Sequence, residues 1–211
     1  MKHIHGLDIP NNLEDVCDPQ CMALLVYDMQ VGIVGQVATG SHIVGQCARV
    51  LAAARSAGMR TVFTRHLSMP KSWMGVTQYR TAMAWQRQTE PDTVKPWFLR
   101  DSPGFQIVPE LAPNADEAVF DKLAMSAFEG TPLTFALRDC GVFAVAIVGI
   151  ATEIGIDPTA RHAADLGFIP VIIENACGAG DEAAATRSLE ALRFAGDAII
   201  TDSQTVIAHL G

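Results

Sequence analysis

Two residues that can exchange a proton lie where predicted buried strands end. Asp28 closes the apolar run MALLVYD, residues 22 to 28, and Lys122 lies two residues beyond the run AVF, residues 118 to 120. Burial of a carboxylate among apolar strands raises its pKa, whereas a neighbouring lysine favours the ionised form. Alone, such an aspartate is often a turn former and such a lysine a surface residue. Together they could pass a proton to and from a substrate.

A third candidate is the turn GIATEIGIDPTARHAADLG, which follows the apolar run VFAVAIV. An α/β enzyme often places its nucleophile in such a turn, but the corresponding position here is Gly155, which has no side chain. The nearest hydroxyls belong to Thr152 and Thr159, and threonine without an activating base is a poor nucleophile. Cys177, after the next apolar run, is typical of an inert thiol among small residues. The sequence therefore predicts chemistry without an obvious covalent nucleophile.

Alternating strands and helices must position these residues. One helical pattern begins near Ser41 and ends at Gly58. Three others cover roughly 131–140, 158–166 and 183–195. Short β-like runs separate most of them, at 22–28, 61–64, 118–120, 143–149, 169–173 and 197–200. This alternation predicts right-handed βαβ units and a largely parallel sheet with helices on both faces. Ligands of such sheets bind at the carboxyl ends of the strands, near the point where the strand order reverses.

The motifs ALLVYDMQ, FDKLAMSAFEGTPL and GIATEIGIDPTARHAADLG, in this order and spacing, resemble those of the isochorismatase-like hydrolases. This superfamily includes isochorismatases, nicotinamidases and N-carbamoylsarcosine amidohydrolases. The resemblance implies an α/β fold, a Rossmann-like three-layer αβα sandwich around a six-stranded parallel sheet. It implies a single domain over residues 1–211, of which about the first 20 are an N-terminal extension. It also assigns catalytic roles to Asp28 and Lys122 and puts Gly155 where the amidases have their cysteine.

Isochorismatases in the superfamily also have a glycine at this place. They cleave a vinyl ether, with the aspartate as general acid. The resemblance therefore implies a hydrolase of a small organic acid in which Asp28 is the general acid, Lys122 tunes it and Gly155 leaves room for substrate. Two alternatives remain: a non-catalytic small-ligand-binding or scaffold protein, and a cysteine amidohydrolase whose nucleophile was replaced at Gly155.

The variable segment from Arg65 to Gln88 mixes aromatic and polar residues suited to a planar or carboxylated ligand. An arginine can hold a carboxylate through two parallel hydrogen bonds. The candidate substrate-binding residues are Arg65, Gln78, Arg80, Trp85 and Arg87, with Ile150 and Ala151 from the turn, where the family commonly has a cis peptide. His66 alone does not make a zinc site with three protein ligands, so we expect neither a metal nor another cofactor.

Composition narrows the class of partner. The 211 residues are 49% hydrophobic and 18% charged, with a net charge of −8, and the 15 Lys and Arg residues form no run. Nucleic acid is disfavoured and a small molecule favoured. No stretch reaches the roughly 18 apolar residues of a membrane span, and the five cysteines suggest free thiols in a cytoplasmic protein. The resemblance also implies a homo-oligomer, a dimer or tetramer.

Overall fold

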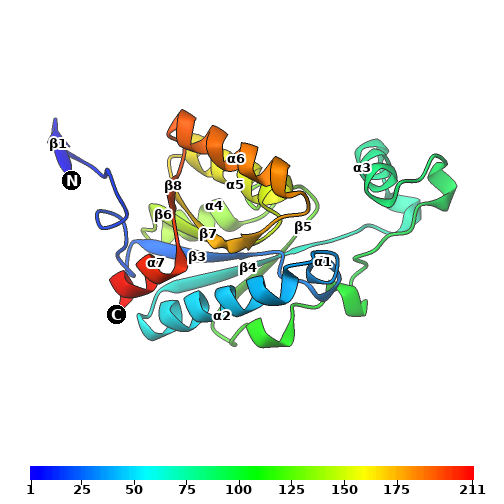
Figure 1. Cartoon of the computed structure of the whole chain (residues 1–211), viewed down its shortest axis with the longest axis horizontal. Coiled ribbons are helices and arrows are strands. Elements are labelled where there is room, and N and C mark those ends of the chain that lie inside the picture. Colours follow the sequence, from blue (N-terminus) through cyan, green and yellow to red (C-terminus); the bar gives the residue numbers. More distant parts are fainter.

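A parallel sheet of six strands forms the centre of the protein, in a computed structural model that describes residues 1–211 (Figure 1). Its strands, in spatial order, are β5 (Ala118–Lys122), β4 (Arg60–His66), β3 (Met22–Tyr27), β6 (Ala144–Ile150), β7 (Ile169–Gly178) and β8 (Ile199–Thr201). Within this sheet the chain forms the central strand β3 first and then β4 and β5 on one side of it. It then returns to form β6, β7 and β8 on the other side of β3. The strand order therefore reverses between β3 and β6, which is where such sheets bind ligands.

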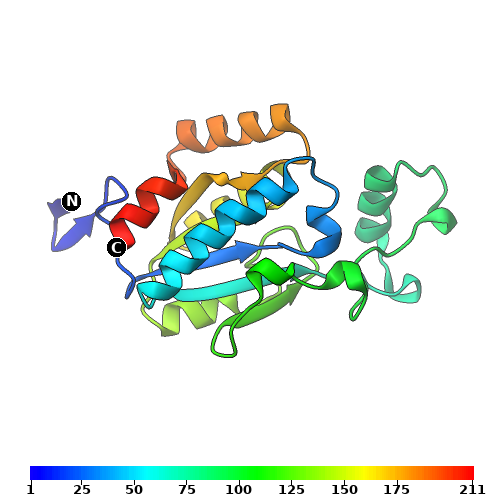
Figure 2. The ribbon, with the colours of Figure 1, turned by 60° about the horizontal axis from the view of Figure 1, so that its bottom comes forward.

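Helices cover both faces of the sheet, so the predicted αβα sandwich is confirmed (Figure 1). On one side lie α2 (Gly40–Ser56) and α7 (Ser203–Leu210), seen side by side when the molecule is turned (Figure 2). On the other side lie α4 (Leu133–Asp139), α5 (Asp157–Asp165) and α6 (Glu182–Ala195). The short helix α1 (Val31–Val34) follows β3.

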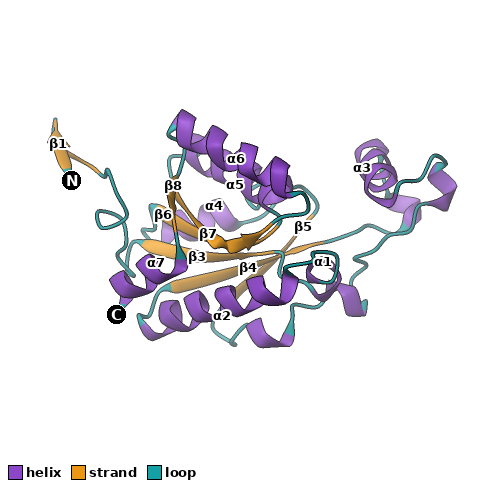
Figure 3. Cartoon of the chain, viewed as in Figure 1, coloured by secondary structure: helices purple, strands orange, loops and turns teal.

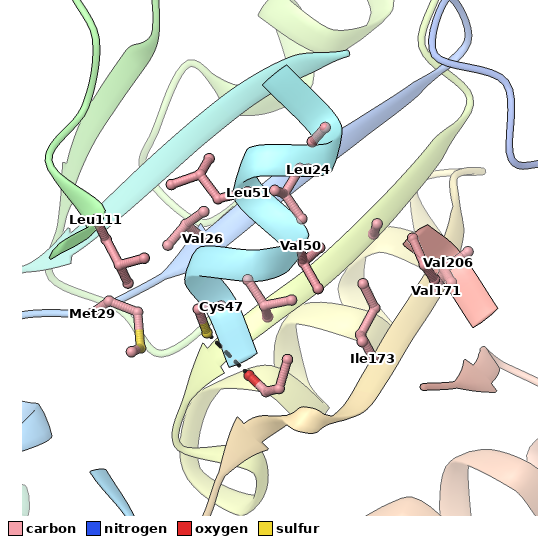
Figure 4. Close-up of a cluster of buried hydrophobic side chains, with 14 of the residues drawn as sticks. Leu24, Val26, Met29, Cys47, Val50, Leu51, Leu111, Val171, Ile173 and Val206 are labelled. Carbon is pink, nitrogen blue, oxygen red and sulfur yellow. Dashed lines mark hydrogen bonds between the residues drawn. The ribbon is translucent and has the colours of Figure 1, made fainter. Parts of the chain in front are cut away.

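The alternation of side chains along β3 divides the core in two, because successive residues of a strand point to opposite faces. All six residues of β3 are buried. Leu24 and Val26 pack with Val50 and Leu51 of α2 (Figure 4). In the same cluster the thiol of Cys47 donates to the carbonyl of Ala176, 3.3 Å away.

The residues of β3 between these point the other way. Ala23, Leu25 and Tyr27 belong to the second cluster, which includes Leu137 of α4 and Ala160 of α5. The alternation thus directs the ring of Tyr27 towards α5, the helix that follows Gly155.

The predicted strands and helices all occur, with shifted ends. The strand β7 continues to Gly178, beyond the apolar run, and the C-terminal helix α7 has no counterpart in the predicted set. The helix predicted over 158–166 begins at Asp157. A π-helical turn over Thr152–Ile156 leads directly into α5, with Pro158 in the first turn of α5, where proline needs no hydrogen-bonded N–H.

Two segments extend away from the sandwich. The N-terminal residues form an antiparallel hairpin of β1 (Lys2–Ile4) and β2 (Leu7–Ile9), whose residues are all exposed. Residues 67–98, which we call the arm, contain α3 (Val76–Gln86) and protrude beyond the end of the sheet in both views (Figures 1 and 2). Colouring by secondary structure shows that loops with short helical turns connect α3 to the sheet on both sides (Figure 3). No helix of the chain combines the length and the apolar character that a membrane crossing requires.

Candidate active site

Asp28 and Lys122 form a buried ion pair at the carboxyl end of the sheet. The Lys122 Nζ lies 2.7 Å from Asp28 Oδ2, and the two residues are 2% and 3% exposed. Residue 28 follows β3 and residue 122 ends β5, two strands away, so β4 lies between them. From β4, the hydroxyl of Thr64 donates to Asp28 Oδ1 at 2.7 Å. The two carboxylate oxygens thus have different donors, one charged and one neutral.

The backbone of Asp28 is in the left-handed region, with φ of +48°. A residue with a side chain adopts this conformation at a cost, and such strain is concentrated at functional sites. The turn directs the carboxylate towards Thr64 and Lys122 at the strand ends.

The ammonium group of Lys122 uses all three of its N–H donors inside the protein. Besides Asp28 it donates to the hydroxyl of Tyr27 at 2.8 Å and to the carbonyl of Ala124 at 3.2 Å. It also lies 4.3 Å from the centre of the Tyr27 ring. A buried ammonium with three acceptors is fully compensated for the hydration that it loses.

Tyr27 is the site residue that sequence reasoning missed. Its hydroxyl accepts from Lys122 and donates to the carbonyl of Met125 at 2.5 Å. Burial, and then the adjacent Asp28 carboxylate, raise the pKa of the Tyr27 phenol well above its usual value, so the group stays protonated. The signal in the sequence was a bulky polar side chain inside a buried strand, directly before the aspartate.

The ring of Tyr27 occupies the space that a side chain at position 155 would need. A Cβ added to Gly155 would lie 1.9 Å from the Tyr27 hydroxyl oxygen and 2.3 Å from Cζ of the same ring. Real Cβ contacts are never this short, so one of the two groups would have to move. The prediction that Gly155 leaves room for substrate is therefore wrong: protein atoms fill that room.

The remaining hydroxyls and thiol near the turn are engaged. Thr152 donates to the carbonyl of Gly178 at 3.0 Å, and Thr159 donates to the carbonyl of Gly155 at 2.6 Å. Burial raises the pKa of the Cys177 thiol well above its usual value, which disfavours the thiolate. The geometry provides no activated nucleophile among these groups.

The backbone of the turn has the cis peptide between Ile150 and Ala151 that the family resemblance implies. The amides of Gly155 and Ile156 both donate to the carbonyl of Ala151, at 2.9 and 3.1 Å. The amide of Gly155 is therefore used within the π-helical turn and does not point at a substrate.

A cavity of about 360 Å³, which we call the Asp28 cavity, adjoins the ion pair. Its lining includes Asp28 and Tyr27, together with Ile150 at the end of β6 and Ala151, Ile154 and Gly180 from the turns after β6 and β7. His66 at the end of β4 and the arm residues Trp85, Arg87, Trp97 and Phe98 also line it. Neither Lys122 nor Gly155 lines it. Of the ion pair, only the carboxylate faces the space where a ligand can bind.

Two of the lining residues set the charge of this cavity. Burial lowers the pKa of His66 to about 4, against the opposing effect of the Asp28 carboxylate, so His66 is neutral near pH 7. Arg87 forms no ion pair or hydrogen bond through its side chain within the protein. The cavity thus offers one free guanidinium to a ligand anion.

The predicted substrate-binding residues lie in different places. Trp85, Arg87, Ile150 and Ala151 line the Asp28 cavity. Gln78 lines a second cavity under the arm.

The two other arginines lie outside both cavities. Arg65 pairs with Asp121 at 2.7 Å and stacks 4.4 Å from the centre of the Phe105 ring, which indicates a structural role. Arg80 is exposed on α3.

The residues present do not fit a metal. The structure has no group of three or more His, Cys, Asp and Glu side chains that could hold an ion, and His66 lies among aromatic rings. Trp85 and Phe98 both meet the His66 ring edge to face, at 6.2 and 6.0 Å between centroids.

Comparisons with known proteins give a consistent result. The family model of the isochorismatase domain matches residues 22–205. An uncharacterized isochorismatase family protein, YecD, of Escherichia coli O157:H7 is 30% identical over 160 residues, which are 74% of this chain and 79% of that protein.

Two solved structures share the fold. A cysteine hydrolase from Pseudomonas syringae pv. phaseolicola 1448A has a TM-score of 0.77 at 24% identity and covers 91% of this chain and 93% of its own. For a putative isochorismatase hydrolase from Oleispira antarctica the TM-score is 0.72 at 26% identity, with coverage of 90% and 97%. The residues that the family model matches, 22–205, include Asp28, Lys122 and the turn at Gly155.

Proposed function

The chain belongs to the isochorismatase family of hydrolases, and on that premise we propose that it cleaves a small organic acid by proton transfer at Asp28, without a covalent intermediate. The observation that carries the proposal is the Asp28 carboxylate, which lines a cavity while being held by Lys122 and Thr64. The rest of the site bears on which bond is cleaved and which ligand is bound.

The proton step begins with the transfer of a proton from Lys122 Nζ to Asp28 Oδ2, which are 2.7 Å apart. The neutral carboxylic acid then protonates the carbon of an enol ether bound in the cavity, which gives an oxocarbenium ion. Water adds to this cation and returns a proton through Asp28 to Lys122. The resulting hemiketal separates into a ketone and an alcohol. In sum, one enol ether and one water give one ketone and one alcohol.

Covalent catalysis by a thiol at position 155 is disfavoured by the contact between that position and Tyr27. A cysteine there would need the phenol to move, and the phenol is held by Lys122 and by the carbonyl of Met125. This geometry argues against an amidase in which a single substitution replaced the cysteine by Gly155. In such an amidase the space for the cysteine side chain would remain open, whereas here the Tyr27 ring fills it. The chain is built around a tyrosine and a glycine together.

The substrate class follows from the cavity walls. Trp85, Trp97 and Phe98 offer flat apolar surfaces, and Arg87 offers a guanidinium that can hold a carboxylate with two hydrogen bonds. A planar, conjugated carboxylic acid with an enol-ether link satisfies both. The net charge of −8 makes this local cation the more important for attracting an anion.

The test is a hydrolysis assay on a panel of enol ethers of small carboxylic acids, read by chromatography of the ketone product. Asp28→Asn should abolish turnover, because an amide cannot transfer the proton. Asp157→Asn is the matched control, since Asp157 pairs with Arg161 at 2.7 Å and lines neither cavity. Turnover that persists in Asp28→Asn refutes the acid role. A panel acid that raises the melting temperature of the wild type without being hydrolysed indicates a binding protein instead.

We further propose that the protein is a cytoplasmic homo-oligomer and that the chain folds as one domain. Phe194 of α6 and Phe135 of α4 are 94% and 73% exposed, and both belong to the same helical layer. Large exposed apolar side chains are frequent at interfaces between subunits. Sedimentation of the wild type against Phe194→Ser tests this, and a wild-type monomer at all concentrations contradicts it.

A further inference from the structure

The side chain of His66 differs from those of the other histidines in its hydrogen bonding. Of the six histidines, three have a ring nitrogen hydrogen-bonded to another group of the protein, and two others are exposed. The three are His3, His162 and His209, and the two are His5 and His42. His66 is not exposed, and its hydrogen bonds within the protein involve only its backbone.

The ring nitrogens of His66 are unpaired but can be reached from outside the protein. The side-chain atoms that are both unpaired and closed off from solvent belong to Gln78, Ser102 and Glu153. The nitrogens of His66 are not among them, so a molecule in the adjoining space can contact them. Polar groups that are removed from water nearly always have a hydrogen-bond partner. The imidazole therefore calls for a partner that the chain itself does not supply.

The backbone and the ring of His66 are both held in place. The side chain of Gln30, which is fully buried, accepts from the amide of His66 at 2.6 Å and donates to its carbonyl at 3.1 Å. The rings of Trp85 and Phe98 meet the imidazole edge to face. A polar group that is fixed in this way is prepared for a ligand before the ligand arrives.

The imidazole lies beside the ion pair, at the Asp28 cavity. His66 lines this cavity together with Trp85 and Phe98, and it also lines the second cavity under the arm. After the larger effect of burial, the charges of Asp28 and Lys122 both act on the pKa of His66, which indicates that the ring is close to them. A ligand that reaches the carboxylate of Asp28 can therefore also reach His66.

The charges of the cavity favour an uncharged group at His66. Asp28 acts more strongly on His66 than Lys122 does, so the ion pair disfavours a second negative charge there. A carboxylate of the ligand is drawn instead to the free guanidinium of Arg87. Because His66 is neutral near pH 7, its ring has one N–H donor and one nitrogen acceptor. A hydroxyl group can pair with either nitrogen, since it both donates and accepts.

We propose that His66 determines specificity in the Asp28 cavity by pairing with a hydroxyl group of the ligand, so that the acid bound there is a hydroxylated carboxylic acid. Arg87 holds its carboxylate, and the aromatic side chains pack against its body. The proposal rests on the proposed function in taking this cavity as the substrate site. It adds the group that is recognised besides the carboxylate, and its test needs no turnover.

Meta- and para-hydroxybenzoate are suitable probes, each compared with the methylbenzoate of the same substitution pattern. A methyl group has nearly the size of a hydroxyl group but forms no hydrogen bond. Isothermal titration calorimetry measures the four affinities. We expect at least one hydroxybenzoate to bind the wild type about three- to tenfold more tightly than its methyl counterpart, the effect of one neutral hydrogen bond.

NMR of the protein with isotope-labelled histidine ring nitrogens identifies the residue that pairs with the hydroxyl. The nitrogen resonances of His66 should shift with the preferred hydroxybenzoate and much less with its methyl counterpart. Those of His162 should not move, because its Nδ1 is bonded to the hydroxyl of Ser126 at 2.9 Å and the residue lines neither cavity.

The variant His66→Phe keeps a ring of similar size and removes both nitrogens. It should abolish the preference for the hydroxyl group and leave the affinity for the methylbenzoates unchanged. His162→Phe is the matched control, since this ring also meets an aromatic neighbour, Phe128, but lies outside both cavities. The control should keep the preference of the wild type.

Three outcomes would overturn the proposal. They are equal affinities within both pairs of probes, which a water molecule held at His66 would produce, a failure of both hydroxybenzoates to bind, and a preference that persists in His66→Phe. The calorimetry and NMR of the wild type decide the matter even if His66→Phe does not fold. A hydroxyl preference in a protein that hydrolyses no enol ether would refute the proposed hydrolysis and support the role of His66, whereas turnover without such a preference would do the reverse.

Discussion

Replacing Gly155 by alanine tests the contact with Tyr27 directly, without knowledge of the substrate. The added Cβ would lie 1.9 Å from the Tyr27 hydroxyl oxygen, whereas ordinary contacts begin near 3.4 Å. The ring must therefore retreat, although two hydrogen bonds of 2.8 and 2.5 Å hold its hydroxyl. Overpacking of a core costs about 1 to 3 kcal/mol. Loss of a neutral and a charge-assisted hydrogen bond adds about 2 to 4 kcal/mol.

We therefore expect Gly155→Ala to lower the free energy of unfolding by about 3 to 7 kcal/mol. The measurement is urea denaturation followed by circular dichroism and by tryptophan fluorescence at one pH. Gly45→Ala is the matched control, because Gly45 lies in α2 with nothing within 4 Å of an added Cβ. That control should gain about 0.5 to 1 kcal/mol, since alanine is the better helix former.

A double-mutant cycle identifies Tyr27 as the cause. Tyr27→Val removes the ring and is itself destabilising, but in its presence Gly155→Ala should cost little. The coupling free energy should therefore be close to the whole cost in the wild type, about 3 kcal/mol or more, which is large for two residues in contact. If Gly155→Ala is as stable as the wild type, or if its cost is the same with valine at position 27, the space-filling relation between the two residues is refuted.

Three further predictions concern the same region. In Tyr27→Val/Gly155→Cys the new thiol lies in the space that the ring leaves, so iodoacetamide should alkylate it faster than the buried Cys47, which peptide mass spectrometry would show; a new thiol as protected as Cys47 would count against this geometry. Tyr27→Phe keeps the ring but leaves Lys122 with one acceptor fewer, so the free energy of unfolding should fall by about 1 to 3 kcal/mol, and an unchanged urea midpoint would contradict the hydrogen bonds. Because the pKa of His66 is about 4 in the folded protein and 6.5 in its ordinary state, the unfolded chain binds more protons between these values. Stability should therefore fall by about 2 to 3 kcal/mol from pH 7 to pH 4, and His66→Leu should lose most of that slope in urea titrations at the two pH values.

The sheet, the helical layers and the Asp28–Lys122 pair follow from local patterns in the sequence. Continuous apolar runs mark strands buried on both faces, and residues at their carboxyl ends must meet at one edge. The contact of Asp28 with Lys122 is accordingly as expected, although 94 residues separate them in the chain.

The side chains around this pair could not be placed in the same way. The contact between Tyr27 and Gly155 joins two segments that are far apart in the sequence, and no pattern in either segment predicts it. The arm has little periodicity and no buried helix residue, so whether Arg65, Gln78 or Arg87 faces a cavity depends on how the loops fold back. The residue type made Arg65 a candidate, but its side chain forms an ion pair with Asp121 on the adjacent strand β5.

The hydrogen bonds of Lys122 separate this residue from any bound ligand. With every N–H committed to Tyr27, Asp28 or Ala124, this cation cannot touch a bound molecule and acts on it only by way of the carboxylate. In the proposed reaction, the strands of the sheet therefore hold the proton donor, and the arm contributes the side chains that contact the bound molecule. Exchange of the arm between relatives should therefore change which molecules bind while the contacts of the Asp28–Lys122 pair stay the same.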